Sequence, residues 1–122
     1  TMQHFITRAS RGEDLTIFGD GEQRRTLIHA EDLSRVILQA SRLPGTQDEI
    51  YNVGGADVLT IAQVARRIAE HFGVAVSSVS WPEAHQRIET GDTVFDDTLL
   101  REQLTPRYEW TFNRWLASLD SC

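Results

Sequence analysis

The sequence predicts a small mixed α/β domain of the α+β type, in which a thin sheet is packed by about five helices. Residues 31–43 and 61–72 place apolar side chains at helical spacing, as amphipathic helices do. Residues 15–18 and 76–81 alternate apolar and polar side chains, as half-buried strands do. Because these helices and strands are mixed along the chain and the strands are few, we expect a mixed fold with a thin sheet.

The first part of the chain predicts one helix and two strands. Apolar residues recur at helical spacing over residues 4–11, and Gly12 follows as a stop signal. Residues 15–18 form a strand, the Gly19-Asp20-Gly21 segment turns the chain, and residues 25–29 alternate again. The sequence leaves open whether these two strands pair as a hairpin.

The next part predicts a helix and a further strand. Glu31 and Asp32 lie at the start of the helix over residues 31–43, where negative charge is favourable, so capping explains both carboxylates without catalysis. Residues 49–53, with the sequence EIYNV, are expected to form a short strand that ends at Gly54-Gly55. No Lys-Ser/Thr follows this glycine pair, so it indicates a sharp turn rather than a Walker phosphate loop.

Clear start and stop signals bound the second long helix. Thr60 is expected to cap the helix over residues 61–72, and Gly73 lies just past its end. A strand over residues 76–81 should follow before Pro82.

The remaining segment predicts an irregular loop and two helices. Residues 83–95 are polar and irregular, a helix should run from Asp96 or Asp97 to Leu104, and an aromatic helix from about Thr111 to Leu119. There is no internal repeat, low-complexity tract or linker. We therefore expect residues 1–122 to form a single domain.

Composition excludes several classes of function. With a net charge of -6 and a pI near 5.1, the surface should repel phosphate backbones, so general nucleic-acid binding is excluded and an anionic ligand needs a local basic cluster. No segment has the pattern of a signal peptide or a membrane span, which predicts a soluble, cytoplasmic protein. Cys122 is the only cysteine and is expected to be a free thiol, and the four histidines show no metal-ligand spacing, so no metal site is predicted.

Three arginines are the candidates for binding an anion. Arg24 and Arg25 are adjacent in an extended segment, so only one of them can face a given pocket, and Arg87 lies in the irregular polar loop. The planar guanidinium group donates two parallel hydrogen bonds to phosphate oxygens, although the spacing also fits solvated side chains. The Gly19-Asp20-Gly21 segment is a turn and not a dinucleotide fingerprint, because Arg24 stands where the third glycine belongs.

The segment LTIFGDGEQRRTLIHAEDL, residues 15–33, resembles a motif of the extended short-chain dehydrogenase/reductase family, the NAD-dependent nucleotide-sugar epimerases and dehydratases. That family motif contains G-D-G-x-Q-x-R and ends in V-x-D. The segments EIYNVGG, TIAQVARRIAEHFG and DDTLLREQL are similar to successive later motifs of the same family. The resemblance covers essentially the whole chain, but only the C-terminal part of the family's enzymes.

The resemblance implies a substrate-binding portion that does not perform hydride chemistry by itself. The family's glycine-rich NAD turn, G-x-x-G-x-x-G, is missing, and neither tyrosine is followed by a lysine four positions later, since the chain has no lysine. We therefore expect no catalytic residue and no cofactor in this chain, NAD or NADP in the parent enzyme, and the N-terminal Rossmann portion as a partner. The parent is expected to be an epimerase, which is an isomerase, or a dehydratase, which is a lyase.

The resemblance also assigns roles to individual residues, with a nucleotide-diphosphate sugar as the ligand. Arg25 matches the family arginine that contacts the diphosphate or its ribose, and Arg87 resembles the second arginine that holds the phosphates. Ile17 and Phe18 match positions on the strand beside the nucleobase. Structural turn or cap roles are implied for four further residues, which are Gly19, Gly21, Asp32 and Asn52.

Two other interpretations remain open. The chain could be a noncatalytic nucleotide-sugar-binding or regulatory domain, or part of a reductase or lyase of the family with a different substrate, since Thr26 replaces the family's usual aspartate. In the family, the region around residues 25–53 packs on the cofactor domain. We therefore expect its apolar faces to drive binding of the missing portion or homo-oligomer formation.

Overall fold

The computed structural model describes residues 1–121, which form two compact units. Unit 1 comprises residues 1–25 and 59–93, and unit 2 comprises residues 26–58 and the chain from Val94 onward. The boundary falls within β2 (Arg24–Leu27) and β3 (Asp57–Thr60), which are neighbours in a two-stranded sheet. Cys122, with its expected free thiol, lies outside the described residues.

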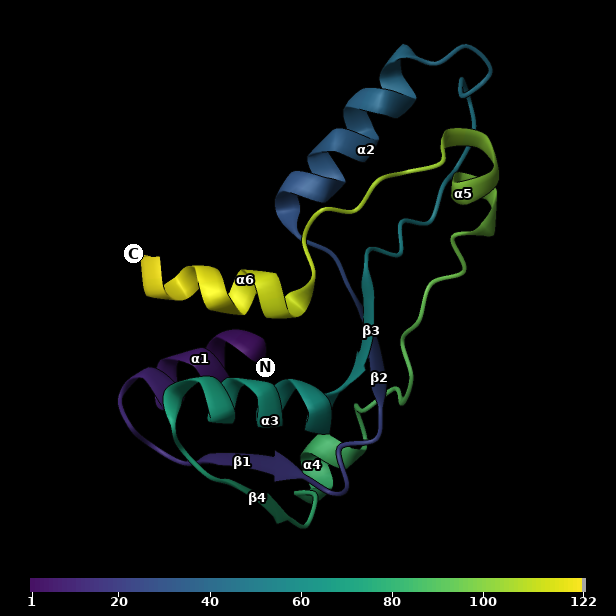
Figure 1. Cartoon of the computed structure of the whole chain (residues 1–122). Helices are drawn as coiled ribbons and strands as arrows, with labels where there is room; N and C mark the ends of the chain where they lie inside the picture. The colour runs from purple at the N-terminus through teal and green to yellow at the C-terminus, as the bar shows by residue number, and fades with distance from the viewer. Residues whose placement is uncertain (122) are drawn as a thin grey trace. The chain divides into compact units, whose positions relative to one another are not determined.

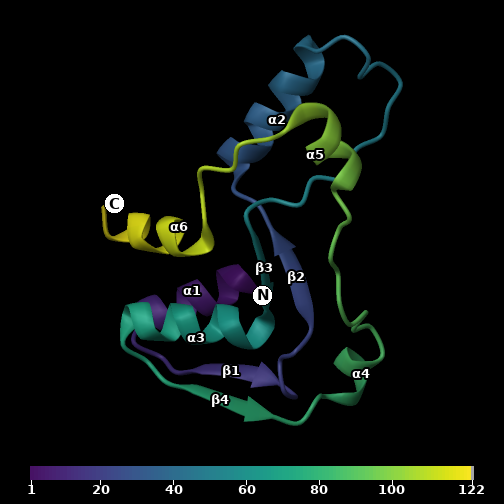
Figure 2. The same cartoon turned by 45° about the vertical axis from the view of Figure 1, so that its right-hand side comes forward.

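In unit 1, two helices pack on a parallel pair of strands. The strands β1 (Leu15–Phe18) and β4 (Val76–Val79) pair in parallel, with Leu15 opposite Val76 and Phe18 opposite Val79. Helices α1 (Met2–Ser10) and α3 (Ile61–Phe72) lie side by side next to β1 (Figures 1 and 2). The open question of a hairpin is thereby answered, because β1 pairs with β4 and β2 pairs with β3.

The core of unit 1 follows from the amphipathic pattern. Its members are the apolar side chains at helical spacing on α1 and α3 and at alternate positions on β1, together with Leu59 of β3. The buried residues are Phe5, Ala9, Leu15, Ile17, Leu59, Ala62, Val64, Ala65, Ile68 and Ala69.

The ends of α3 confirm the start and stop signals. The Thr60 hydroxyl accepts a hydrogen bond from the Gln63 amide at 3.0 Å, and the Gln63 side chain accepts one from the Thr60 amide at 2.9 Å. This reciprocal pair is a capping box. At the other end, Gly73 adopts φ 73° and its amide donates to the Ala69 carbonyl, a conformation in which glycine has no steric penalty.

In unit 2, α2 (Ala30–Arg42) packs against α5 (Thr98–Leu104), and the two helices lie next to each other in both views (Figures 1 and 2). Val36, Leu100 and Leu104 form the buried cluster between them. The partly buried residues packed against that cluster are Ala40, Tyr51, Val53 and Tyr108. Unit 2 also contains α6 (Phe112–Ser118) and a 3-10 turn, η1 (Leu119–Ser121).

The expected strand over residues 49–53 is wrong. The structure assigns these residues no strand, and Ile50 is 88% exposed. A strand requires a neighbouring strand to pair its backbone groups, whereas this segment is attached to unit 2 through its side chains. Tyr51 donates a hydrogen bond to Gln103 and Asn52 donates to the Asp96 carbonyl at 3.3 Å, while β3 begins later, at Asp57.

The segment 83–95, expected to be irregular, contains one further turn of helix, α4 (Glu83–Gln86). The amides of His85 and Gln86 both donate to the Pro82 carbonyl at 3.0 Å. Pro82 precedes the helix and Glu83 places a negative charge in its first turn, both of which favour a helix start. With α4 the described residues contain six α-helices, one more than the approximate number expected. Over residues 1–121, no helix is both long and apolar enough to cross a membrane.

Candidate functional site

The turn after β1 brings an aromatic side chain against the backbone of Gly19. Gly19 has φ 67°, and a Cβ atom built there would lie 2.5 Å from Nε1 of Trp81. Only glycine both tolerates this backbone conformation and leaves room for the indole ring. The sequence suggested a turn residue here, and the structure adds the reason for glycine, which is the close approach of Trp81.

The same turn is attached to the beginning of α3. The Gly21 carbonyl accepts a hydrogen bond from the Ala62 amide at 2.9 Å, and the Gln23 carbonyl accepts one from the Ile61 amide at 3.1 Å. These bonds satisfy amides at the helix start that have no partner within the helix. A Cβ atom at Gly21 would lie 3.0 Å from Cβ of Ala62, so the turn and the helix approach closely.

Three aromatic rings from different elements meet at the end of β1. The centroid of the Phe18 ring lies 5.4 Å from that of Trp81, with an interplanar angle of 46°. On another element, α4, His85 places its ring centroid 5.4 Å from that of Phe18, at 77°. Phe18 and Trp81 are half-buried, whereas Ile17 is buried in the core of unit 1. Phe18 therefore offers an aromatic face for stacking. Ile17, the residue before it, packs in the core and holds the strand in place.

The Arg25 guanidinium donates three hydrogen bonds, two to backbone carbonyl oxygens and one to a carboxylate with which it also forms an ion pair. Its Nη1 donates to the carbonyl oxygens of Gly91 and, at 3.0 Å, of Arg24. Its Nη2 donates to Oε1 of Glu89 at 2.8 Å, and the side chains of this ion pair are 27% and 24% exposed. The hydrogen bond from Arg25, which outweighs the effect of burial, lowers the pKa of Glu89 below its usual value. Arg25 is thus an oriented, partly buried cation.

Arg24 points to a different carboxylate. Its backbone amide donates to Oδ1 of Asp92 at 2.7 Å, and its Nε donates to Oδ2 at 3.0 Å. These bonds, the one from the backbone first, lower the pKa of Asp92. Neighbouring residues of an extended strand point in opposite directions, which explains why the two arginines pair with different acids.

Arg87 is the most exposed of the predicted binding residues. It follows α4, its side chain is 75% exposed, and it pairs with Glu83 one turn earlier. Arg25 and Arg87 therefore both belong to unit 1 but pair with different carboxylates.

Asp32 is buried in unit 2, where it binds the chain ahead of α6. The residue at the N-cap of α2 is His29, whose Nδ1 accepts from the Glu31 amide at 3.0 Å. Asp32 instead accepts from the backbone amides of Glu109 and Trp110, at 3.0 and 2.9 Å, and from Arg35 at 2.6 Å. Burial favours a raised pKa, but these hydrogen bonds outweigh it and hold the pKa of Asp32 below its ordinary value.

The sequence pattern assigned no specific partner to the neighbouring Trp110. Its ring stacks on His29 with a centroid distance of 4.3 Å and an angle of 12°, and the Arg114 guanidinium carbon lies 4.3 Å from the centroid of the indole ring. Its Nε1 donates to Glu31 at 2.8 Å. The contacts with His29 and Glu31 connect residues about 80 positions apart, so no local pattern in the sequence signals them.

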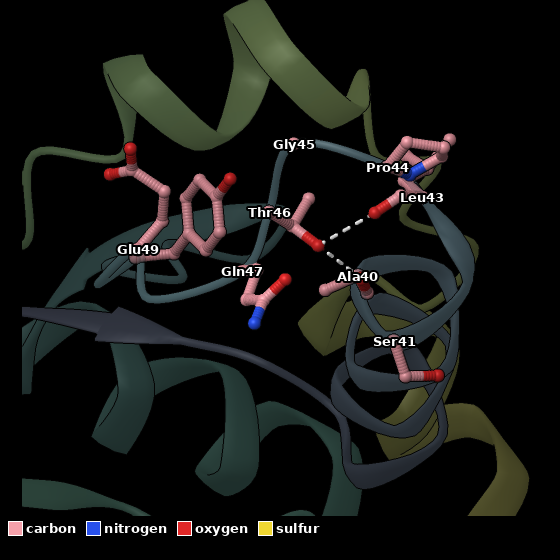
Figure 3. A pocket seen from close by; sticks show the side chains of 9 residues that line it. Ala40, Ser41, Leu43, Pro44, Gly45, Thr46, Gln47 and Glu49 are labelled. Atoms are coloured by element: carbon pink, nitrogen blue, oxygen red, sulfur yellow. Dashed lines mark hydrogen bonds between the residues drawn. The ribbon is translucent and has the colours of Figure 1, made fainter.

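A pocket of about 530 Å³ lies in unit 2, at the end of α2 and along the segment that follows it (Figure 3). Thr46 donates within it to the carbonyl oxygens of Ala40 and Leu43, at 2.6 and 2.9 Å (Figure 3). None of the binding residues predicted from the sequence lines this pocket. Among residues 1–121, no group of three or more metal-ligating side chains is close enough to hold a metal ion.

Comparisons with known proteins agree on one family. Residues 1–54 match the model of the NAD dependent epimerase/dehydratase family. A dTDP-glucose 4,6-dehydratase from Streptomyces niveus is 33% identical over 69 residues, which are 57% of this chain and 20% of that protein. A dTDP-4-dehydro-6-deoxy-D-allose reductase from Streptomyces bikiniensis is 37% identical over 68 residues, 56% of this chain and 20% of that protein. The chain thus spans about a fifth of the length of these curated relatives.

The fold is also similar to a solved enzyme. The structure of a UDP-glucose 4-epimerase from Thermotoga maritima with UDP-glucose matches with a TM-score of 0.78 and 26% sequence identity. The match covers 94% of this chain and 36% of that one, so nearly all of the described fold recurs within a longer enzyme.

Proposed function

Because this chain belongs to the NAD-dependent epimerase/dehydratase family, we propose that it is the substrate-binding portion of a nucleotide-sugar epimerase or dehydratase. The nucleotide-diphosphate part of the substrate binds to unit 1, with Arg25 on the phosphates and the Phe18 ring beside the base. The observation that carries this proposal is the oriented Arg25 guanidinium in a chain of net charge -6. An anionic ligand requires such a local cation, because the net charge repels it elsewhere.

The aromatic group at the end of β1 supplies the second part of this site. Phe18 contacts the rings of both Trp81 and His85, and it is half-buried, so its orientation is fixed while part of its surface stays available. Stacking of a base on an aromatic side chain contributes about 1–3 kcal/mol in proteins that bind single-stranded nucleic acids. Gly19 keeps the turn close enough for Trp81 to support this ring.

The test is the affinity of the chain for UDP and dTDP, measured by isothermal titration calorimetry. Arg25→Ala should weaken binding by about 10- to 150-fold, which corresponds to roughly 1.5–3 kcal/mol for a charge-assisted hydrogen bond. Arg11→Ala is the matched control, because it removes the same charge from an exposed residue of unit 1 ahead of β1. Equal affinities of the Arg25→Ala and Arg11→Ala variants would contradict the proposal.

Arg87 contributes less to this site. Its guanidinium is 75% exposed, and interactions of exposed ions are typically about 1 kcal/mol or less. We expect Arg87→Ala to weaken UDP binding by less than about fivefold.

Hydride transfer requires residues that this chain does not contain. The family uses NAD, but the sequence has neither a G-x-x-G-x-x-G turn nor a lysine, so its residues do not fit a complete NAD site. We propose that a separate segment or polypeptide with those motifs completes the enzyme, and that residues 1–122 act as one substrate-binding domain toward it. The cytoplasm remains the expected compartment.

Exposed apolar side chains support this need for a partner. Ile37 and Leu38 on α2 and Ile50 in the following segment are all largely exposed. Apolar surface of this kind favours association. The chain alone should therefore self-associate, which static light scattering would detect as a mass above that of the monomer. The double variant Ile37→Glu and Ile50→Glu should be a monomer. A monomeric unmodified chain at high concentration would exclude self-association.

A reductase acting on a nucleotide sugar is the second candidate. It is favoured by the similarity to the Streptomyces bikiniensis enzyme described above, whose name specifies a dTDP-linked substrate. Both candidates share the nucleotide-diphosphate group, so the affinity measurements apply to either. A screen of nucleotide sugars against the chain would distinguish these candidates from a noncatalytic domain with another ligand.

A further inference from the structure

We propose that Glu89 occupies the phosphate position on Arg25 in the unliganded chain, and that a nucleotide diphosphate binds by displacing this carboxylate. Glu89 would then determine the affinity and the charge selectivity of the site. This inference rests on the proposed function, since it assigns a competitor to the same arginine.

The contacts of Arg25 divide into an anchor and an exchangeable partner. Nη1 donates to two backbone carbonyl oxygens, those of Arg24 and Gly91, and these fix the plane of the guanidinium group. Nη2 donates to a carboxylate at the end of a flexible side chain, that of Glu89. These backbone oxygens cannot leave without a movement of the main chain, whereas the Glu89 side chain can rotate away. Exchange of the anion therefore leaves the anchor intact.

The backbone near Glu89 also holds its carboxylate in this position. Its Oε1 also accepts the Gly91 backbone amide, at 3.0 Å, so the carboxylate folds back over its own turn. Gly91 in turn supplies one of the two carbonyl oxygens that anchor Arg25. The Arg25 hydrogen bond keeps the pKa of Glu89 lowered, so at neutral pH the group is a charged competitor.

A diphosphate is suited to replace this carboxylate. It presents several oxygens and more negative charge, and the guanidinium fork binds phosphate and carboxylate oxygens with the same geometry. A ligand without phosphate has no group that can take the place of Glu89. Such a ligand therefore leaves the Arg25–Glu89 ion pair undisturbed. The ion pair therefore disfavours only those ligands that use Arg25.

The decisive variant is Glu89→Gln, which keeps the shape and the acceptor oxygen for the Gly91 amide but removes the competing charge. We expect its affinity for UDP to rise about twofold to fivefold, in the range typical of a partly exposed ion pair. Its affinity for uridine should not change. Glu13→Gln is the control, since it removes one carboxylate from the exposed Arg8–Glu13 pair of the same unit.

The outcomes separate this inference from the proposed function. If Arg25→Ala weakens UDP binding while Glu89→Gln leaves it unchanged or weaker, Glu89 orients Arg25 instead of competing with the ligand, and only the inference fails. If the affinity for UDP rises equally in the Glu13→Gln variant, the change in net charge explains the effect, and the inference is also overturned. If the unmodified chain does not bind UDP, both proposals fail.

A measurement on the unmodified chain tests the same displacement without a mutation. The pKa of Glu89 is followed by 13C NMR of its carboxyl carbon, with and without saturating UDP. We expect the pKa to rise toward its ordinary range when UDP is present, because the Arg25 hydrogen bond that lowers it is lost. A pKa that stays lowered would show that the ion pair survives ligand binding.

Discussion

Replacing Asp32 by asparagine should destabilise unit 2 by about 2–4 kcal/mol. The Asp32 side chain is fully buried and accepts two backbone amides, those of Glu109 and Trp110. Hydrogen bonds to a charged group contribute about 1.5–3 kcal/mol, and a buried amide left without an acceptor costs about 1–3 kcal/mol. Asparagine keeps one acceptor oxygen but turns its amino group toward the other amide, so one bond becomes neutral and one is lost.

The assay is urea unfolding followed by circular dichroism, together with hydrogen exchange of the Glu109 and Trp110 amides. Exchange at both amides should accelerate in Asp32→Asn, because their acceptor changes directly. Glu102→Gln on α5 is the matched control, since it removes the same charge from an exposed side chain and should stay within about 0.5 kcal/mol. An Asp32→Asn variant as stable as this control would refute the reasoning.

Three other predictions concern stability. Thr60→Ala removes the hydroxyl of the capping box and should cost about 1 kcal/mol in thermal or urea unfolding. Gly19→Ala combines φ 67° with a Cβ atom 2.5 Å from Trp81 Nε1, and should lower stability by more than about 1 kcal/mol and weaken UDP binding, which calorimetry on the same variant checks. The pKa values of Asp32 and Glu89 are lower in the folded chain than in the unfolded chain, where they are about 3.9 and 4.3. Both ionised carboxylates therefore stabilise the fold at a pH above these unfolded-state pKa values, and this stabilisation is lost as the pH falls through the folded-state pKa values. Asp32→Asn should show a smaller loss of stability on acidification than the unmodified chain, which urea unfolding at pH 3 to 6 measures.

Local signals were sufficient for the elements whose ends carry a specific side chain. Helix α3 begins after Thr60 and ends before Gly73, as expected. A side-chain cap and a left-handed glycine each depend on only a few neighbouring residues, so the local sequence is enough to predict them. The segment 49–53 shows the limit of this reasoning. Alternating apolar residues fit a strand, but a strand forms only beside another strand, and that is a property of the tertiary fold.

For the candidate site, residue identity was easier to predict than residue environment. The two adjacent arginines indicated a local cation, and the alternation of an extended segment correctly separated the directions of Arg24 and Arg25. The sequence did not indicate that Glu89 pairs with Arg25, since the two residues are 64 positions apart. The sequence likewise indicated a structural role for Asp32 but not its hydrogen-bond partners, because Glu109 and Trp110 are distant from it in sequence.

We propose that unit 1 binds a nucleotide diphosphate at Arg25 and Phe18. The most direct measurement is a map of amide chemical shifts in the chain as UDP is added. We predict that the largest changes fall on Phe18, on Arg25 and on residues 87–91, with the Trp81 indole signal moving as well. Changes confined to the pocket of residues 40–51 in unit 2, or no changes at millimolar UDP, would contradict the account.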